Sequence, residues 1–485
     1  MELLERLVQA GHTRLSIGGS WAAASDGAEI DVLDPATGEC LTRVSSGSED
    51  DARSAVEAAA AAAPAWARTA PRDRSEILRR AFELMVARAD ALAELVVLEM
   101  GKALGEARAE VLYAAEFFRW YSGEAVRNMG GILTAPGGDK RILSVHQPVG
   151  ISLLITPWNF PAAMATRKIG PAVAAGCTMI LKPASDTPLT ALAMAELLRE
   201  AGLPDGVLNV FPSSRSSRVV PVILADDRVR LVSFTGSTEV GRGLLAEAAK
   251  TVVNTSMELG GNAPFIVLED ADVDAAVEGA MIAKMRNGGQ SCIAANRFLA
   301  HESVAKPFGR KLSAAMAALR VGPGLEAGVE LGPLINRSAQ EEMRESVELS
   351  LGAGAHLLTG GHAPDRPGFF FEPTVLSDVT PDDPILEREV FGPVAPITSF
   401  ATDEEAIQLA NDTPYGLASY LYAGDLSRAL RVAEAIEAGM VGVNRGLISD
   451  PAAPFGGVKQ SGIGREGAHE GMLEFLETKY IAVDW

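Results

Sequence analysis

The sequence has few cysteines, and none of them is paired at metal-binding spacing. Its 485 residues include only Cys40, Cys177 and Cys292, which lie far apart in the chain. Three isolated cysteines provide neither a disulfide framework nor the paired spacing of a zinc site, so no metal is expected. They indicate a reducing compartment, and the expected location is the cytoplasm.

Positive charge and long apolar runs are also scarce. Lys and Arg total 43 against 63 Asp and Glu, which gives a formal net charge of −20. An acidic chain is a poor partner for nucleic acid or for an anionic membrane surface, so neither partner is expected. The longest apolar runs, such as 149–156, are far shorter than the ~20 residues that cross a bilayer. The N-terminus has no basic region followed by an apolar stretch, so no signal peptide is predicted.

The chain is too long for one hydrophobic core, and at least two domains are expected. Its hydrophobic content of 47% and charged content of 22% are typical of a globular protein. Residues 1–48 are predicted to be irregular, with short strand signals, and helices are predicted over 49–64, 73–99 and 102–127. Between 149 and 250 strands alternate with helices, which is the rhythm of a doubly wound parallel sheet. The predicted strands are 150–156, 178–182, 207–211 and 230–234, and the helices are 161–175, 188–201, 215–224 and 238–250.

A second alternating region extends from about 264 to 445, with strand signals at 265–268, 298–300 and 395–400. The segments 141–147 and 476–483 are predicted to be extended, and little in their sequences requires other parts of the same chain to cover them. This pattern is compatible with β-pairing across a subunit interface.

A candidate nucleophile lies in the stretch Gly-Gly-Gln-Ser-Cys at 288–292, which follows a helical run over 272–285. Small residues allow a substrate carbon to approach the Cys292 thiol, although a lone cysteine is more often a small buried hydrophobe. Two other stretches favour chemistry: Glu258 before a Gly-Gly turn, and Asn159 between two prolines. A thiol, a base and an amide donor are the parts of acyl chemistry at an aldehyde carbon. Because a thiolate is needed, the Cys292 pKa is predicted to lie below the free value of about 8.5.

Seven motifs occur in an order that resembles the aldehyde dehydrogenase superfamily from about residue 15 to the C-terminus. Three further stretches, 166–168, 285–287 and 446–449, are similar to the succinate-semialdehyde dehydrogenases within that superfamily. The seven motifs are Pro-Trp-Asn-Phe-Pro at 157–161, Leu-Lys-Pro-Ala at 181–184, Phe-Thr-Gly-Ser at 234–237, Glu-Leu-Gly-Gly at 258–261, Gly-Gln-Ser-Cys at 289–292, Glu-Val-Phe-Gly-Pro at 389–393 and Pro-Phe-Gly-Gly at 454–457.

The resemblance implies an α/β fold with a Rossmann-type cofactor domain, an α/β catalytic domain and a small β oligomerisation arm. The expected boundaries are 1–129 and 149–259 for the dinucleotide-binding domain and 260–445 for the catalytic domain. Segments 130–148 and 470–485 form the expected arm, which implies a homodimer or homotetramer.

The resemblance also implies a reaction, the oxidation of succinate semialdehyde to succinate through a cysteine thiohemiacetal and a thioester. Cys292 is the implied nucleophile and Glu258 the base that activates water. The Asn159 side chain and the Cys292 N–H form the implied oxyanion hole. Alternative substrates are another semialdehyde, such as glutarate semialdehyde, or an aliphatic aldehyde. A non-enzymatic protein that kept this fold is a further alternative, and the presence of all three residues argues against it.

The implied cofactor is NADP or NAD, although the fingerprint Gly-x-Gly-x-x-Gly is absent. The strand-to-helix turn at 234–238 instead offers free N–H groups to a phosphate. A carboxylate at position 185 would repel a 2′-phosphate, whereas Ser185 and Lys182 can bind one, so NADP is the expected preference. Asp186 weakens that preference. The implied cofactor contacts are Trp158, Lys182, Ser185, Gly236, Ser237, Leu259, Glu389 and Phe391.

An acid-tailed substrate needs cations, and Arg167, Arg286 and Ser449 match the carboxylate-binding residues of the family. The planar fork of Arg suits a carboxylate because it forms two parallel hydrogen bonds. Relatives often have a second cysteine two residues after the nucleophile, but Ala294 stands there in this sequence. Other departures are Arg445, Asp450 and the stretch 211–215.

Overall fold

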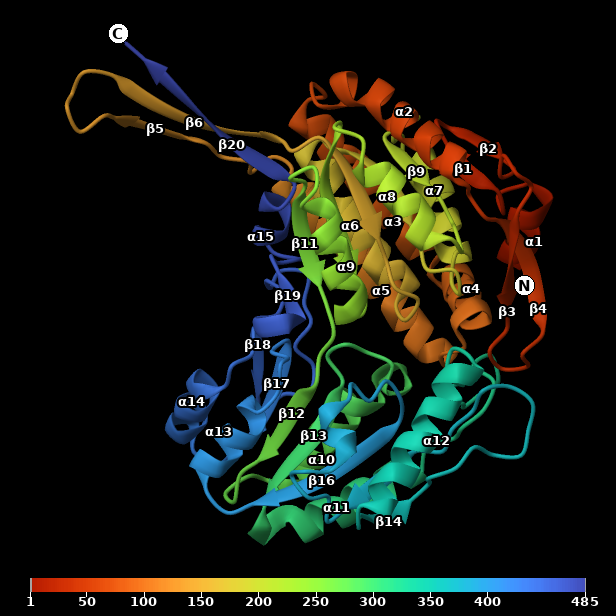
Figure 1. The fold of residues 1–485 in the computed structure, drawn as a ribbon, viewed down its shortest axis with the longest axis vertical. Helices are drawn as coiled ribbons and strands as arrows, with labels where there is room; N and C mark the ends of the chain where they lie inside the picture. Colours follow the sequence, from red (N-terminus) through yellow and green to blue (C-terminus); the bar gives the residue numbers. More distant parts are fainter. Residues whose placement is uncertain (1, 485) are drawn as a thin grey trace.

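The protein is described here from a computed structural model that covers residues 2–484. Two large sheets form the upper and lower halves of the molecule, and a third, small sheet projects from the upper half (Figure 1). A two-stranded sheet of β3 (Glu29–Leu33) and β4 (Cys40–Ser45) lies near the N-terminus. This arrangement is the α/β fold that the sequence predicts.

The eight-stranded sheet contains five parallel strands in the order β11-β10-β7-β8-β9. All residues of β7 and β8 are buried, because helices cover both faces of the sheet. The strands in spatial order are β19 (Gly462–Ile463), β11 (Asn254–Glu258), β10 (Val229–Thr235), β7 (Ile151–Ile155), β8 (Thr178–Lys182), β9 (Leu208–Val210), β1 (Leu15–Ile17) and β2 (Ser20–Ala22).

The helices on the two faces belong to separate hydrophobic clusters. One cluster joins the sheet to α3 (Pro71–Ala87), α4 (Ala89–Met100), α5 (Leu104–Glu124), α6 (Pro161–Ala175) and α7 (Leu189–Glu200). The other joins it to α2 (Glu49–Trp66), α8 (Ser216–Leu224) and α9 (Thr238–Ala248). Helix α6 begins with Pro161 at its first turn and ends at Gly176, whose φ of 92° is left-handed. Pro and Gly at these two places start and stop a helix.

Two predictions in the N-terminal region are wrong, and a third, the helix end near Pro64, is met to within two residues. Residues 2–9 form helix α1 (Glu2–Gln9), which buries Leu4 and Leu7, in a region predicted to be irregular. Helix α2 continues past Pro64 to Trp66. The predicted helix 73–99 is two helices separated at Arg88. Nine of the 12 residues of α4 are buried but only six of the 17 in α3, so the two segments have different surroundings.

The seven-stranded sheet is parallel except for its edge strand β14. Successive residues of β12 face opposite sides, as in any strand. Phe265 packs with α10 (Val273–Met285) and α11 (Glu302–Ala317), and Ile266 packs with α13 (Asp403–Asn411) and α14 (Leu426–Ala435). The strands in spatial order are β14 (His356–Thr359), β15 (Thr374–Ser377), β16 (Val394–Phe400), β13 (Ala295–His301), β12 (Ala263–Val267), β17 (Ala418–Tyr422) and β18 (Met440–Val443), and α12 (Arg337–Gly352) packs beside them.

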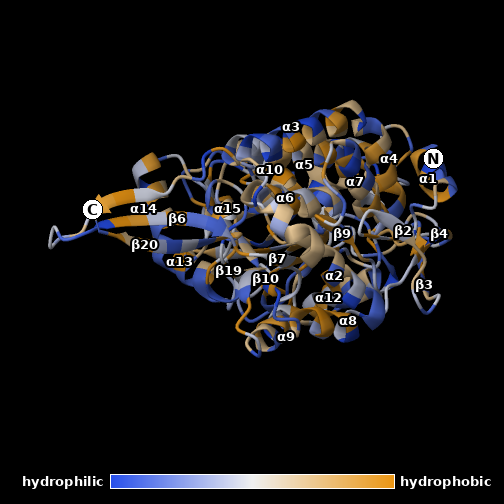
Figure 2. Ribbon diagram, turned by 90° about the horizontal axis from the view of Figure 1, so that it is seen from above, coloured by the Kyte–Doolittle hydropathy of each residue, from blue (hydrophilic) through white to orange (hydrophobic). Residues whose placement is uncertain are grey.

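The third sheet is an antiparallel projection of β5 (Gly131–Thr134), β6 (Arg141–Pro148) and β20 (Leu476–Val483). Strands were expected at 141–147 and 476–483, and both are present. Strand β5 was not expected, because glycines there suggested a break. Ile132 is 71% exposed and Tyr480 is 56% exposed, and Figure 2 shows hydrophobic residues along these projecting strands. Among residues 2–484, no helix is both long and apolar enough to cross a membrane.

Candidate active site

The carboxyl ends of the parallel strands bring most of the predicted residues to one edge of the eight-stranded sheet. Ile155 of β7 pairs with Lys182 of β8 and with Phe234 of β10, and Thr235 pairs with Glu258 of β11. The segments that follow these strands therefore start side by side, where open α/β sheets bind their ligands. They carry Trp158, Asn159, Lys182, Ser185, Gly236, Ser237, Glu258 and Leu259.

The Cys292 loop has a backbone that two glycines make possible. After α10, the residues Asn287, Gly288 and Gly289 have φ values of 56°, 60° and 77°. A Cβ atom at position 289 would lie 2.1 Å from the carbonyl oxygen of Gly392, so only glycine fits there. The turn places Cys292 directly before β13, and the residue keeps partial exposure.

Hydrogen bonds join Asn159 to this loop. Asn159 Nδ2 donates to the Gln290 carbonyl at 3.0 Å. Asn287 Nδ2 donates to the Asn159 carbonyl at 2.9 Å. The Cys292 N–H makes no hydrogen bond to any described residue. One Asn159 amide hydrogen and the Cys292 N–H are therefore available to a substrate oxygen next to the thiol.

Burial raises the pKa of the Cys292 thiol to about 12, and the charge of Glu389 raises it further. Arg167 opposes this shift, while Glu258 and Glu466 add to it. The prediction that the pKa of the Cys292 thiol is lowered is therefore wrong. Desolvation and surrounding carboxylates disfavour the thiolate more than the single nearby cation favours it.

The Glu258 carboxyl, whose charge acts on this thiol, has no hydrogen-bond partner in the described structure. It is 2% exposed. Burial raises its pKa well above the usual range, and the charge of Glu466 adds to this effect. Lys168 and Arg167 oppose the shift, and both pair with Glu466, with Nζ to Oε1 at 2.6 Å and Nη1 to Oε2 at 3.5 Å. An unpartnered carboxyl with a raised pKa is a suitable proton acceptor.

The guanidinium of Arg167 is occupied by protein groups. It donates to the Tyr113 hydroxyl at 2.7 Å and to Ser449 Oγ at 3.4 Å, in addition to its pair with Glu466. The Phe455 ring lies 4.1 Å from it, and Tyr113 also hydrogen-bonds Ser449. Tyr113 was not predicted as a site residue; it lies one helical turn before Phe117 on α5.

Arg286 is different, because its guanidinium makes no hydrogen bond or ion pair with residues 2–484. It lies over the rings of Phe160 and Tyr113, at 4.9 and 5.6 Å. Arg286, Ser449 and these two rings line a cavity of about 500 Å³. The same four residues line a small hollow that also contains Cys292. A free guanidinium and the thiol therefore share one space.

Two predicted residues at the strand ends suit the adenosine end of a dinucleotide. Lys182 is 4% exposed, and its Nζ donates only to the Pro183 carbonyl among the described residues. Burial lowers its pKa to about 8. Ser185 Oγ donates to the Ser213 carbonyl at 3.2 Å. A buried ammonium with unused donors favours an anionic or hydroxyl-rich ligand.

The turn after β10 has the form expected for a phosphate contact. Ser237 caps the N-terminus of α9, where free N–H groups attract negative charge. A Cβ atom at Gly236 would lie 2.4 Å from the Phe234 ring, so the turn needs glycine. These residues fit a dinucleotide at this edge of the sheet.

The remaining predicted cofactor residues meet where the two large sheets adjoin. Glu389 Oε1 accepts a hydrogen bond from the Gly261 N–H at 3.0 Å, just beyond Glu258. Burial raises the Glu389 pKa to about 7. The rings of Trp158 and Phe391 meet edge to face at 5.5 Å. Leu259 is buried, and its N–H donates to the Ser461 carbonyl.

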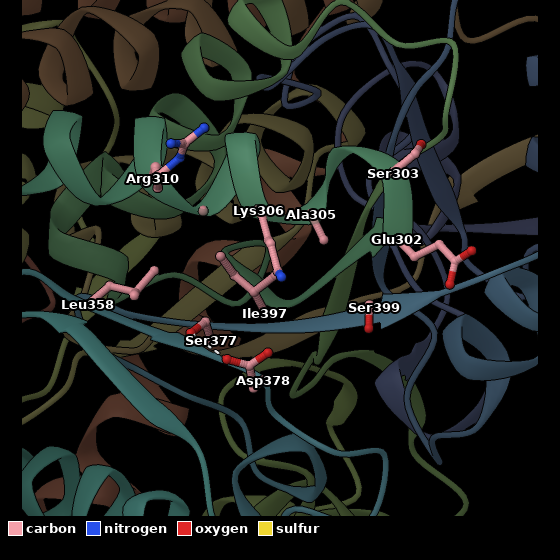
Figure 3. Close-up of a pocket in the computed structure, with 11 residues that line it drawn as sticks. Glu302, Ser303, Ala305, Lys306, Arg310, Leu358, Ser377, Asp378, Ile397 and Ser399 are labelled. Atoms are coloured by element: carbon pink, nitrogen blue, oxygen red, sulfur yellow. Dashed lines mark hydrogen bonds between the residues drawn. The ribbon is translucent and has the colours of Figure 1, made fainter.

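A separate hollow of about 760 Å³ lies between α11 and the seven-stranded sheet. Figure 3 shows Lys306 and Arg310 on the helix above Ile397, with Asp378 opposite them. None of the predicted site residues lines this hollow.

Residues 21–481 match the model of the family described as the aldehyde dehydrogenase family. The chain belongs to the aldehyde dehydrogenase family. A succinate-semialdehyde dehydrogenase of Paenarthrobacter nicotinovorans is 58% identical to this aldehyde dehydrogenase over 443 residues, 91% of this chain and 98% of the relative. A glutarate-semialdehyde dehydrogenase of Pseudomonas putida is 50% identical over 467 residues, 96% of this chain and 97% of the relative. The crystal structure of an Escherichia coli NADP-dependent enzyme has a TM-score of 0.96 at 48% identity and covers 98% of each chain.

Proposed function

We propose that this aldehyde dehydrogenase oxidises succinate semialdehyde to succinate with NADP⁺ or NAD⁺, using Cys292 as the nucleophile. The observation that carries the substrate class is the unpaired guanidinium of Arg286 in the space that also holds the thiol. A half-buried guanidinium without a hydrogen-bond partner among the described residues can bind an anionic group, and a carboxylate matches its fork with two hydrogen bonds. The relative from Paenarthrobacter supports the same substrate.

In the first step Cys292 Sγ forms a bond to the aldehyde carbon, and the thiol proton passes to a base. With a thiol pKa of about 12 this proton passes to solvent water as the carbon–sulfur bond forms. The aldehyde oxygen becomes negative and accepts hydrogen bonds from Asn159 Nδ2 and the Cys292 N–H. Each such donor stabilises the charge by ~3 kcal/mol.

A bound nicotinamide would supply the hydride acceptor, and once the hydride has left the substrate carbon Cys292 holds the acyl group as a thioester. Glu258 then takes a proton from water, which attacks the thioester carbon and releases succinate and the thiol. Lys168 and Arg167 hold Glu466 close by, and their positive charges favour the ionised form of Glu258. Glu389 and the Trp158 and Phe391 rings would hold the nicotinamide half, and Lys182 and Ser185 the adenosine half.

NADP is the preferred cofactor in this proposal, because Ser185 adds no negative charge where a 2′-phosphate would lie. Lys182 supplies a buried cation beside it. The solved Escherichia coli enzyme, which is described as NADP-dependent, supports this preference.

Glutarate semialdehyde, which is one carbon longer, is the second candidate. The Pseudomonas putida relative favours it, and a cavity of about 500 Å³ has room for either chain. A panel of four- and five-carbon semialdehydes, with butanal and pentanal as neutral partners, tests the proposal with both cofactors. The expected result is the highest kcat/KM for succinate semialdehyde with NADP⁺. A higher value for the five-carbon acid would assign the second candidate, and a preference for butanal would refute both.

The assembly is a homodimer or homotetramer in this proposal, and the projecting sheet (130–148 and 470–485) is its arm. Exposed Ile132, Leu133 and Tyr480 on this sheet support a second copy as the partner. Residues 1–129 with 149–259 would form the cofactor domain and 260–445 the catalytic domain. The location is cytoplasmic, without nucleic acid or membrane partners. Light scattering tests the assembly, and a monomer at micromolar concentration would contradict it.

A further inference from the structure

Three charged residues occur at intervals of four around the start of α5. Lys102 and Glu110 are each 2% exposed, and Glu106 between them is half-buried on the wall of the substrate cavity. Glu106 and Glu110 lie four apart on one face of α5, and Lys102 lies two residues before this helix begins. None of the chemical steps above uses these side chains, although removing charges from water is costly.

Lys102 and Glu110 form an ion pair that holds the segment containing Asn159. Lys102 Nζ donates to the Asn159 carbonyl at 2.9 Å and lies 4.1 Å above the Phe160 ring. Glu110 Oε1 accepts from the N–H groups of Ala162 and Ala163, at 2.9 and 3.3 Å, in the first turn of α6. The pair therefore fixes the backbone on both sides of the Asn159 side chain.

Glu106 holds the other half of the site. Its Oε1 accepts from the Asn287 N–H at 2.7 Å, at the first left-handed residue of the Cys292 turn. Asn287 Nδ2 donates to both the Asn159 carbonyl and the Gln290 carbonyl, at 2.9 and 3.0 Å. One helix face thus contacts both segments that would supply oxyanion donors.

We propose that Lys102, Glu106 and Glu110 are positioning residues for the oxyanion site. They set the separation of the Asn159 amide and the Cys292 N–H, and they do so through backbone groups of Asn159, Ala162 and Asn287. The inference rests on the proposed function, in which Asn159 binds the negative oxygen. Donors act on the transition state only when they are held at short range, and a misplacement of about 1 Å costs roughly 10²-fold in rate.

A double-mutant cycle tests the proposal. The variant Lys102→Met/Glu110→Gln removes both members of the pair, so no lone charge stays buried. We expect its kcat to fall ~10²-fold for both succinate semialdehyde and butanal, while the KM for NADP⁺ changes less than about twofold. In the Asn159→Ala background the same change should lower kcat less than about threefold, because the donor that it positions is already absent.

Glu116→Gln is the matched control, since it changes a half-exposed acid on the same helix whose one ion pair among the described residues is with Arg119. It should keep the wild-type kcat. An equal loss from the pair variant with and without Asn159 would overturn the proposal, and so would a loss that appears mainly in the KM for NADP⁺. If Asn159→Ala alone keeps full activity, the proposed function fails first, which is a different result.

Glu106→Ala is the second variant, and it decides the matter if the pair variant does not fold. We expect its kcat to fall about tenfold or more, with a smaller fall in the Asn159→Ala background. A folded Glu106→Ala enzyme with wild-type kcat for both aldehydes would contradict the proposal.

Discussion

Replacing Arg286 by Met should separate recognition of the substrate carboxylate from the chemistry. The guanidinium has no hydrogen-bond or ion-pair partner within residues 2–484, so its loss breaks no such contact, although its charge also lowers the pKa of Glu106. A hydrogen bond to a charged group contributes ~1.5–3 kcal/mol, which corresponds to a roughly 10- to 150-fold fall in kcat/KM. This fall applies to succinate semialdehyde. For butanal, which has no carboxylate, kcat/KM should change less than about twofold.

Replacing Arg167 by Met should have a different effect, although the sequence pattern assigns both arginines to the substrate carboxylate. Its guanidinium already contacts Glu466, Tyr113 and Ser449. Arg167→Met removes a cation that favours ionised Glu258 and thiolate Cys292. The kcat should therefore fall for succinate semialdehyde and butanal alike, and the thermal midpoint should fall as well.

The assay is steady-state reduction of NADP⁺ with each aldehyde, for both variants and one control. Arg119→Met is the matched control, because Arg119 also lies over an aromatic ring, 5.6 Å from Phe82, on an exposed part of α5. It should behave as wild type. Equal losses on both aldehydes in Arg286→Met would refute the assignment of Arg286 to the carboxylate.

Three other predictions follow from the charges at the site. Ser185→Glu should lower kcat/KM for NADP⁺ by about tenfold or more, because the new carboxylate repels the 2′-phosphate. The kcat/KM for NAD⁺, which lacks this phosphate, should stay nearly unchanged. An equal change with both cofactors would contradict the placement of the 2′-phosphate. Without cofactor, the rate of Cys292 alkylation by iodoacetamide should rise about tenfold per pH unit between pH 7 and 10, since the thiol pKa is about 12. A rate that stops rising below pH 9 would show that the thiolate is already formed. Glu258→Gln should gain stability relative to wild type by ~1.4 kcal/mol per pH unit from pH ~4.3 up to the raised pKa of the folded carboxyl, and the difference should be constant above it. In this window the unfolded carboxyl has released its proton and the folded one still holds it. A difference that does not change with pH would mean that the folded pKa is normal.

The order of elements between 149 and 250 could be predicted because the residues that begin and end each element lie within it or directly beside it in the sequence. Strand β8 (Thr178–Lys182) and helix α6 (Pro161–Ala175) have the predicted bounds. Pro161 marks the start of the helix, and Gly176 follows its last residue. Strand β11 (Asn254–Glu258) was missed, because Asn-Thr-Ser-Met-Glu has little apolar pattern and is ordered by its neighbours in the sheet. The N-terminal helix was missed for a similar reason, since the burial of Leu4 and Leu7 depends on distant partners.

The predicted site residues are found because short motifs surround them, but their electrostatics depend on the whole fold. The pKa of Cys292 reflects Glu389, Glu258 and Glu466, which are distant in sequence. The role of Lys102 depends on a contact with Asn159 across 57 positions. A spacing of four between Glu106 and Glu110 on α5 was the only local signal for that cluster, and many surface helices have the same spacing.

A single-turnover experiment with Glu258→Gln tests the central claim most directly. The enzyme is mixed with succinate semialdehyde and excess NADP⁺, and the reduced cofactor and the intact protein mass are followed together. The account predicts a rapid burst of about one equivalent of NADPH per site, followed by slow turnover and a succinyl group on the peptide that contains Cys292. Steady turnover without a burst, or a full burst in Cys292→Ala, would contradict it.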